Sequence, residues 1–377
     1  MKSKHIYKSI ACGVLLALTA TSCDLDYNPV DSYSDVTEGV DKTDEKPIFN
    51  SVQDVETSMV TLHKKFRDQQ EHWYVDKLLI GDAHSDNAYA GTTGAEVVPY
   101  ETNSIEGSNS VLKRDWDRFL GDIAEANRII VGCEQLKALS DSERGKYQSQ
   151  AKIFRAMVMF DMVRLWGNFP VITTVGGDIT EDNVEEMYPT YFPPQNTAEE
   201  AYAQIEKDLT EAVENPNTPT NDASDKSILT KSVARAMLAK VYAEKPLRDY
   251  AKVIKYADEL AADGFDLVED FSDLWAYDTE KKDCRVRNTK EAILEAHFPP
   301  GSGNWCTWMF GRNLSNWDES FTWAKWITLS ASMRSKETRN ATMSLLYGTS
   351  ADGATIIRQT IMLSCTNAAL LSTVSFI

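Results

Sequence analysis

The stretch "SQAKIFRAMVMFDMVRLWGNFPVI", residues 149–172, decides the fold of this 377-residue chain. Between Ile153 and Trp166, apolar side chains cover nearly the whole circumference of a helix. Such a segment is typical of a helix at the centre of a fold, because every face needs a covering element. We therefore predict one long central helix with further helices packed around it.

Both ends of this helix are predicted by local signals. Ser140 and Glu143 form an S-x-x-E capping box, which satisfies free backbone amides at a helix start. Gly167 and Pro170 follow the apolar run and give a stop signal. The sequence thus predicts a helix from about residue 140 to Trp166.

Helical periodicity extends to other parts of the chain. Apolar spacing predicts helices over about 52–67 and 110–137, and a second capping box, Thr197 with Glu200, opens another. Trp116 and Trp166 lie on the apolar stripes of two of these helices, so we expect both in the core.

Residues 229–263 alternate small and bulky apolar residues over two helices, an arrangement similar to a tetratricopeptide hairpin. A plain helical hairpin within a bundle is the alternative. From residue 264 onward the pattern changes, and "EAILEAHF", residues 291–298, predicts a short strand.

The first 22 residues read as a signal peptide. Three lysines precede the apolar run "IACGVLLALTA", and small residues lead to Cys23. The pattern resembles a bacterial lipoprotein signal, in which Cys23 is acylated and becomes the mature N-terminus. Ordinary secretion with a free cysteine is the alternative.

Several of these segments together resemble one family. The motifs are "CDLDYNP", "SQAKIFRAMVMFDMVRLWGNFPVI", "AEEAYAQIEKDLTEAVENP" and "LTKSVARAMLAKVYAE". In this order and spacing they look like the SusD/RagB family of outer-membrane nutrient-binding lipoproteins of Bacteroidetes.

The resemblance implies a mainly α fold of tetratricopeptide-like hairpins with irregular loops and few short strands. It also implies no catalytic activity, a lipid anchor in the outer membrane, and a protein that faces the cell exterior. Its implied partners are a SusC-like TonB-dependent transporter and an oligosaccharide, or a peptide in the RagB branch.

The N-terminal signal, the family resemblance and the composition of the last residues together give the expected domain boundaries. They are a signal peptide over 1–22, a lipidated tether and entry segment over 23–50, a SusD-like helical domain over 51–326, and an aberrant tail over 327–377. Within the domain we expect an N-terminal SusD-like part over about 51–220, the hairpin over 229–263, and the start of a C-terminal SusD/RagB part over about 264–326.

Charge and motifs narrow the function classes. A formal net charge of −18 argues against nucleic acid, whose phosphates would be repelled. The four cysteines beyond Cys23 form no CxxC pair, and no P-loop, GxGxxG, GxSxG or HExxH motif occurs. We therefore expect no cofactor, no metal and no catalytic residues.

The segment "GDAHSDNAYAG", residues 81–91, is the first candidate ligand site, and we expect it to be a loop. There Asp86 and Asn87 could hydrogen-bond sugar hydroxyls, while Tyr89 could stack on a sugar ring. Simple turn formation is the alternative for the Asp and Asn. Asp82, His84 and Asp86 could also be imagined as metal ligands, but the sequence indicates no further ligands.

Tryptophans are the second group of candidates. The stretch "WCTWMFGRNLSNWDESFTWAKW", residues 305–326, contains five of the nine tryptophans without helical or strand periodicity. Aromatic rings stack well on sugars but also anchor large loops. We list Trp305, Trp308 and Trp317 as candidate ligand residues, together with Trp73 at a helix edge.

The composition changes abruptly after Trp326. Residues 327–377 are rich in serine and threonine, and the family normally continues well beyond this length. We hypothesise a frameshift near residues 327–333, since residues 353–371 can be back-translated into family-like text in another frame.

The sequence therefore predicts a glycan-binding surface lipoprotein. A peptide-binding RagB-like protein, a structural scaffold of tetratricopeptide-like repeats, and a non-functional truncated product stay open. A glycan-cleaving enzyme is the least favoured alternative, because no pair of catalytic carboxylates can be recognised.

Overall fold

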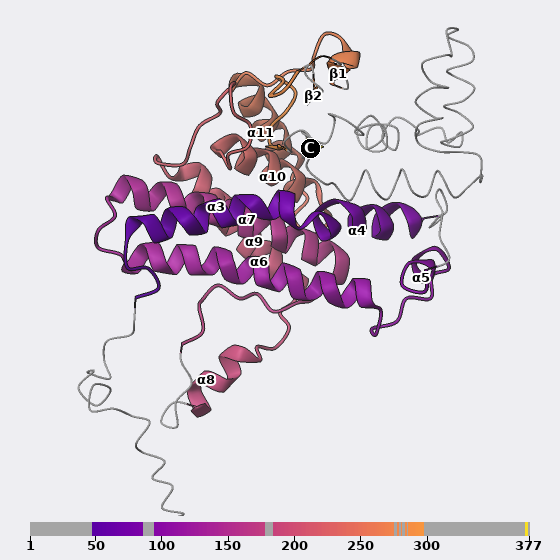
Figure 1. Ribbon diagram of the computed structural model, residues 1–377, viewed down its shortest axis with the longest axis vertical. Coiled ribbons are helices and arrows are strands. Elements are labelled where there is room, and N and C mark those ends of the chain that lie inside the picture. Colours follow the sequence, from indigo (N-terminus) through magenta and orange to yellow (C-terminus); the bar gives the residue numbers. More distant parts are fainter. Residues whose placement is uncertain are drawn as a thin grey trace, which may run out of the picture. The chain divides into compact units, whose positions relative to one another are not determined.

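The computed structural model describes most of the chain between residues 47 and 297. The described residues are 47–85, 94–177, 184–274, 277–278, 280, 283–284, 286–297 and 374–375. Within this part the protein is mostly helical (Figure 1). The predicted mainly α fold is confirmed.

The helices of the described part follow one another along the chain. In order they are α3 (Val52–Asp68), η1 (Glu71–Val75), α4 (Asp76–Leu78), η2 (Leu79–Ala83), α5 (Val98–Glu101), α6 (Ser110–Gln135), α7 (Asp141–Trp166), α8 (Val184–Tyr191), α9 (Ala198–Glu214), α10 (Lys231–Ala243), α11 (Tyr250–Ala262) and η3 (Phe271–Leu274). The segments η1 and η2 are π-helical, and η3 is a 3-10 turn.

The central helix has the predicted limits. Ser140 is the N-cap of α7, its hydroxyl accepts from the Glu143 amide, and the Glu143 carboxylate accepts from the Ser140 amide. At the other end, Gly167 caps the helix with a positive φ of 74°, a conformation that glycine adopts without strain. Thr197 and Glu200 form the same reciprocal cap on α9.

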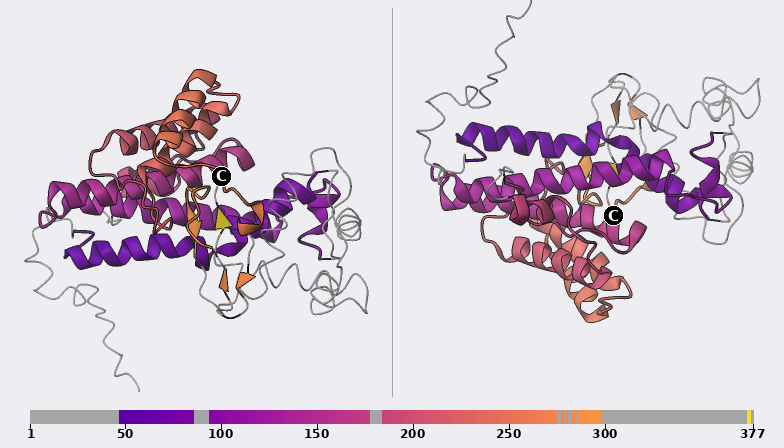
Figure 2. Two further views of the ribbon diagram at one scale, coloured as in Figure 1. Left: turned by 90° about the horizontal axis from the view of Figure 1, so that it is seen from above. Right: turned by 90° about the horizontal axis from the view of Figure 1, so that it is seen from below.

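The core is arranged around α7. This helix packs between α6 and α9, while α3 packs on α6 (Figure 2). Nearly every residue of α7 from Ala151 to Val163 is buried, since neighbours cover it on several sides. The prediction of a central helix is confirmed.

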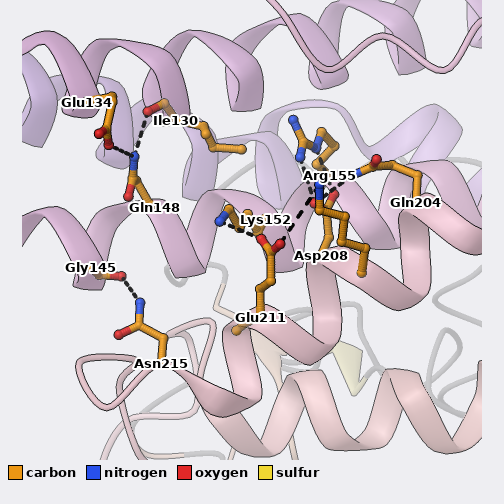
Figure 3. A network of polar contacts seen from close by, with 12 residues as sticks. Ile130, Glu134, Gly145, Gln148, Lys152, Arg155, Gln204, Asp208, Glu211 and Asn215 are labelled. Carbon is orange, nitrogen blue, oxygen red and sulfur yellow. Dashed lines mark hydrogen bonds and ion pairs between the residues drawn. The ribbon is translucent and has the colours of Figure 1, made fainter.

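A buried polar cluster links three of these helices. Arg155 of α7 donates two hydrogen bonds to the Asp208 carboxylate of α9, at 2.8 and 2.7 Å, and one to Asn127 Oδ1 of α6, at 2.6 Å. Gln204 Nε2 also donates to Asp208 Oδ1, at 2.8 Å (Figure 3). Since Arg155 and Asp208 are both buried, this cluster fixes how the three helices sit relative to one another.

The predicted hairpin over 229–263 is present as α10 and α11. Helix α10 packs on α9, and α11 packs on α10 (Figure 1). Ala234 of α10 lies in the core and Ala236 packs against it, and such small side chains let helices approach closely.

Trp116 and Trp166 pack against the core, as expected, and both are partly buried. Their rings meet edge to face, with 5.4 Å between the centroids. One prediction needs correction in detail. Of the strand expected over 291–298, the described residues form only β3 (Glu295–Ala296), because the preceding residues turn, with the Ala292 amide donating to the Thr289 carbonyl at 3.1 Å.

The remaining strands are equally short. β3 pairs antiparallel with β4 (Val374–Ser375), and β1 (Tyr277–Asp278) pairs antiparallel with β2 (Asp283–Cys284). Two-residue ladders cannot form a sheet core, so the helices supply the core of the described part.

Candidate functional site

Most of the residues predicted to bind ligand lie outside the described residues. These are Asp86, Asn87, Tyr89, Trp305, Trp308 and Trp317, and the lipidation candidate Cys23 lies outside them as well. What the structure does define is the surrounding scaffold, above all the two ends of the segment that carries the first three.

Trp73 is in the described part and belongs to the core. It lies in η1 and is 1% exposed. Its ring meets Phe66 at 4.9 Å, Phe154 at 5.7 Å and Phe119 at 6.2 Å between centroids. A ring enclosed in this way has no free face for a sugar, so the expectation that Trp73 contacts ligand is wrong in this structure.

The segment 81–91, expected to be a loop, is helical at its start, and its residues 86–91 lie outside the described residues. Gly81 and Ala83 are still in the π-helical turn η2, and the His84 amide donates to the Leu79 carbonyl at 3.2 Å. This bond spans five residues, so it continues the wide π-helical turn. Gly81 is a turn-forming residue type, but a single glycine does not interrupt a helix that tertiary contacts stabilise.

The structure describes the chain up to Ser85 and again from Gly94. Residues on both sides of this gap contact the scaffold. On the outgoing side, the His84 ring meets the Tyr100 ring of α5 edge to face at 6.5 Å. On the returning side, the Glu96 carbonyl accepts from Asn109 Nδ2 at 2.9 Å. Asn109 is also the N-cap of α6, so the start of α6 is tied to the turn that contains Glu96.

A buried charge cluster lies beside these anchors. Arg114 of α6 pairs with Asp76 of α4, and its Nε lies 3.9 Å from Asp115 Oδ1. Burial, followed by the adjacent Asp76 charge, raises the pKa of Asp115 to about 9. Burial and the charges of the same two carboxyls raise the pKa of Tyr100 to about 12.

This cluster is unsuited to chemistry on a polysaccharide. Asp76, Asp115 and Tyr100 are all buried, whereas a glycosidic bond must reach both carboxyls of a hydrolase. A raised pKa in a carboxyl is often a sign of an active site, but it also results from structural burial. Here the arrangement fits a structural support under the loop ends.

A second buried pair joins α6 to η1. His72 Nε2 lies 3.0 Å from Asp122 Oδ2, and Lys65 Nζ of α3 lies 2.7 Å from Asp122 Oδ1. Burial lowers the pKa of His72 despite the adjacent carboxylate, so the imidazole is neutral near pH 7. Sequence reasoning missed Asp122 and Asp115, because it treated that face of α6 as an uninterrupted apolar stripe.

An exposed aromatic surface is found on α8. Tyr188 is 56% exposed and Phe192 is 68% exposed, and their ring centroids lie 4.9 Å apart with a tilt of 36°. The Tyr191 hydroxyl donates to the Gly177 carbonyl at 2.5 Å, which ties the end of the helix to the preceding loop. We call Tyr188, Tyr191 and Phe192 the α8 aromatic surface; the sequence reading did not single it out.

The described residues form neither a metal-binding cluster nor a membrane-spanning helix. Within those residues no group of three or more His, Cys, Asp or Glu side chains is placed to hold a metal ion. None of the helices described is both long and apolar enough to cross a membrane.

Comparison with known proteins gives one family match. Residues 31–243 match the SusD-like family model described as starch-binding and associating with the outer membrane. A SusD-like protein of Bacteroides ovatus is 25% identical over 318 residues, which cover 81% of this chain and 51% of that protein.

Solved structures share the fold. A laminarin-binding SusD-like protein has 20% identity and a TM-score of 0.53, covering 68% of this chain and 53% of that one. Surface glycan-binding protein A from Bacteroides fluxus has 20% identity and a TM-score of 0.54, covering 69% and 53%. The protein of that name from Bacteroides thetaiotaomicron, in complex with laminarihexaose, has 16% identity and a TM-score of 0.52, covering 66% and 49%. The chain thus spans about half the length of these relatives.

Proposed function

Because the chain belongs to the SusD-like family of starch-binding proteins that associate with the outer membrane, we propose that it is a non-catalytic, glycan-binding surface lipoprotein. In this role it captures oligosaccharides and delivers them to a SusC-like TonB-dependent transporter. The family match over residues 31–243 is the observation on which the proposal rests, since it includes the helices from α3 to α10.

The ligand-binding residues we propose are Asp86, Asn87 and Tyr89, together with Trp305, Trp308 and Trp317. For the first three, the scaffold gives support: α5 and the N-cap of α6 anchor both ends of their segment. Anchored ends reduce the conformational entropy that a loop loses on binding a ligand. The polar side chains of Asp86 and Asn87 suit sugar hydroxyls, and the ring of Tyr89 suits a sugar face.

The distribution of the carboxyls supports binding over cleavage. Among the described residues, Asp115 is the carboxyl with a strongly raised pKa, and it is enclosed with Asp76 in the scaffold. Neither carboxyl can approach a glycosidic oxygen without unfolding of the surrounding helices.

Calorimetric titration with laminarin oligosaccharides and with malto-oligosaccharides tests the proposal. We expect one of these glucans to bind, and Tyr89→Ala to weaken binding by about tenfold or more. Tyr250→Ala is the matched control, because Tyr250 is an exposed tyrosine on α11, and it should bind like the unaltered chain. Absence of saccharide binding, with binding of peptides instead, would favour the RagB-like alternative and refute the glycan proposal.

The anchor and the transporter partner are tested in cells. Cys23→Ser should abolish incorporation of labelled fatty acid and release the protein from the outer-membrane fraction. The unaltered protein should co-purify with a SusC-like transporter after cross-linking. If Cys23→Ser stays membrane-bound and labelled, Cys23 is not the lipidated residue.

A further inference from the structure

The two ring nitrogens of His72 in η1 have different surroundings. The side chain is 0% exposed, and Nε2 lies 3.0 Å from Oδ2 of Asp122 on α6. Because an ionised carboxylate only accepts hydrogen bonds, Nε2 carries a hydrogen and donates to Asp122. Nδ1 is buried as well, and no described group forms a hydrogen bond with it. His72 is therefore held as the neutral tautomer with its hydrogen on Nε2.

The cations around His72 already have carboxylate partners. They come from α3, α6 and α4, and the ion pairs are Lys65 with Asp122 (2.7 Å), Arg118 with Glu71 (2.9 Å) and Lys77 with Asp161 (2.5 Å). Burial lowers the pKa of His72, and the positive charges of Arg118 and Lys77 lower it further, against the opposite effect of Asp122. A protonated His72 would be an additional positive charge beside pairs that are already balanced.

Protonation would also create a buried donor without an acceptor. The added hydrogen goes to Nδ1, since Nε2 already carries one. The rings that pack on the imidazole are Phe119, at 4.7 Å, and Trp73, at 5.5 Å between centroids, and their faces are apolar. A buried N–H of a charged group is costly without an acceptor, and contact with water removes that cost.

We propose that His72 makes η1 an acid-sensitive latch: the neutral ring holds η1 on α6, and protonation opens η1 so that Nδ1 reaches water. We expect the opening to be local, because η1 is a π-helical turn of five residues, a rare conformation that usually occurs as a single turn. Such a segment opens at a lower free energy than whole helices such as α3 and α6. Because Trp73 of η1 is buried in the core, the open state is a minor one at neutral pH.

The direction of the pH effect follows from the two states. In the open state His72 titrates near the ordinary histidine pKa of 6.5, whereas the closed state resists protonation. The closed state therefore has its full stability above about pH 6.5 and loses stability as the pH falls below that value. Between pH 7.5 and 5.5 the open population should rise about tenfold. The inference does not depend on glycan binding, since His72 is enclosed in the scaffold.

Amide hydrogen exchange with mass spectrometry, at pH 7.5 and 5.5 and corrected for intrinsic exchange rates, tests the proposal on the full chain. We expect the opening of η1 to rise about tenfold at the lower pH. His72→Gln should remove this rise, because glutamine offers Asp122 an amide donor but takes up no proton. His84→Gln is the matched control, since His84 is an exposed histidine just beyond η2, and it should keep the rise. No rise in the unaltered chain, a rise that persists in His72→Gln, or an equal rise over α3 and α6 would overturn the proposal.

A second measurement uses the unaltered chain, so it applies even if His72→Gln does not fold. Exchange of the imidazole hydrogen on the carbon between the two nitrogens follows the protonation of each histidine. The tryptic peptide 68–77 contains His72 as its one histidine, so the signal is assigned directly. The pKa of His72 read in this way should lie below 6.5. A pKa of 6.5 or higher would contradict the latch, since the closed state would then accept the proton.

Discussion

Replacing Arg155 should destabilise the protein more than replacing any exposed charged residue nearby. Arg155→Met removes all three hydrogen bonds that the guanidinium donates, two to Asp208 and one to Asn127. Of the hydrogen bonds to Asp208 that Figure 3 shows, the one from Gln204 then remains. Its carboxylate, 1% exposed, stays buried without a balancing charge.

The expected cost follows from that isolated charge. Removing one partner of a buried ion pair costs about 3–5 kcal/mol, because the remaining charge has lost its partner but not its burial. At about 2–4 °C of melting temperature per kcal/mol for a large domain, the loss corresponds to roughly 6–20 °C. The loss of a donor to Asn127 adds about 1 kcal/mol.

The double variant Arg155→Met with Asp208→Leu separates the cost of burying an unpaired charge from the attraction between the two charges. Since both charges are gone, no isolated ion remains, and such exchanges are often neutral or stabilising by about 1–4 kcal/mol. We expect the double variant to be more stable than Arg155→Met alone. Urea unfolding, followed by both far-UV circular dichroism and tryptophan fluorescence, gives the free energies of unfolding.

Lys152 provides the matched control. It pairs with Glu211 at 2.7 Å between the same two helices, but both side chains are partly exposed (Figure 3). Lys152→Met should therefore cost about 1 kcal/mol or less. The reasoning is refuted if Arg155→Met costs no more than Lys152→Met, or if the double variant is as unstable as the single one.

Three further predictions concern single residues. Asp115 has a pKa near 9 in the folded protein against 3.8 ordinarily, so folding takes up a proton and stability falls as pH rises from about 4 to about 9. Asp115→Asn should raise stability at pH 8 by about 1 kcal/mol or more and flatten this dependence, as urea unfolding at several pH values will show; an unchanged pH profile would contradict it. Gly132→Ala should destabilise the protein, because its Cβ would lie 2.3 Å from the Phe49 ring, whereas Gly121→Ala, with open space around it, should stabilise it by about 0.5–1 kcal/mol in thermal unfolding. Burial raises the pKa of Cys133 to about 12, so its thiol should react with a thiol reagent only after unfolding. Mass mapping of the labelled cysteines is the measurement, and labelling of Cys133 without denaturant would contradict the prediction.

Local signals explain why so much of the helical fold could be predicted. The Ser140 and Thr197 capping boxes, the stop at Gly167 and the hairpin over 229–263 all appear at the expected positions. Each depends on residues within a few positions of one another, so the sequence contains the whole signal. The family match over residues 31–243 includes the two capping boxes, the stop at Gly167 and α10.

The candidate site was harder to predict because its determinants are distant in sequence. Tryptophan is a residue type that often binds sugars, yet the rings of Phe119 and Phe154 enclose Trp73 in the core. Glycine is common in loops, yet Gly81 lies in the π-helical turn η2. Neither outcome could be deduced from the neighbouring residues in the sequence, since each depends on which helices contact the residue in the folded protein.

The helical class, the helix ends, the central position of α7 and the family resemblance could all be deduced from the order of the residues. The packing of the helices determines which polar residues are buried together, such as Arg155 with Asp208, and which apolar residues stay exposed, such as Tyr250 and Ile254. The two kinds of property differ in how far apart in the sequence the interacting residues lie. Caps and periodicity act within one helix, whereas burial is a property of the contacts that helices far apart in the sequence make with each other.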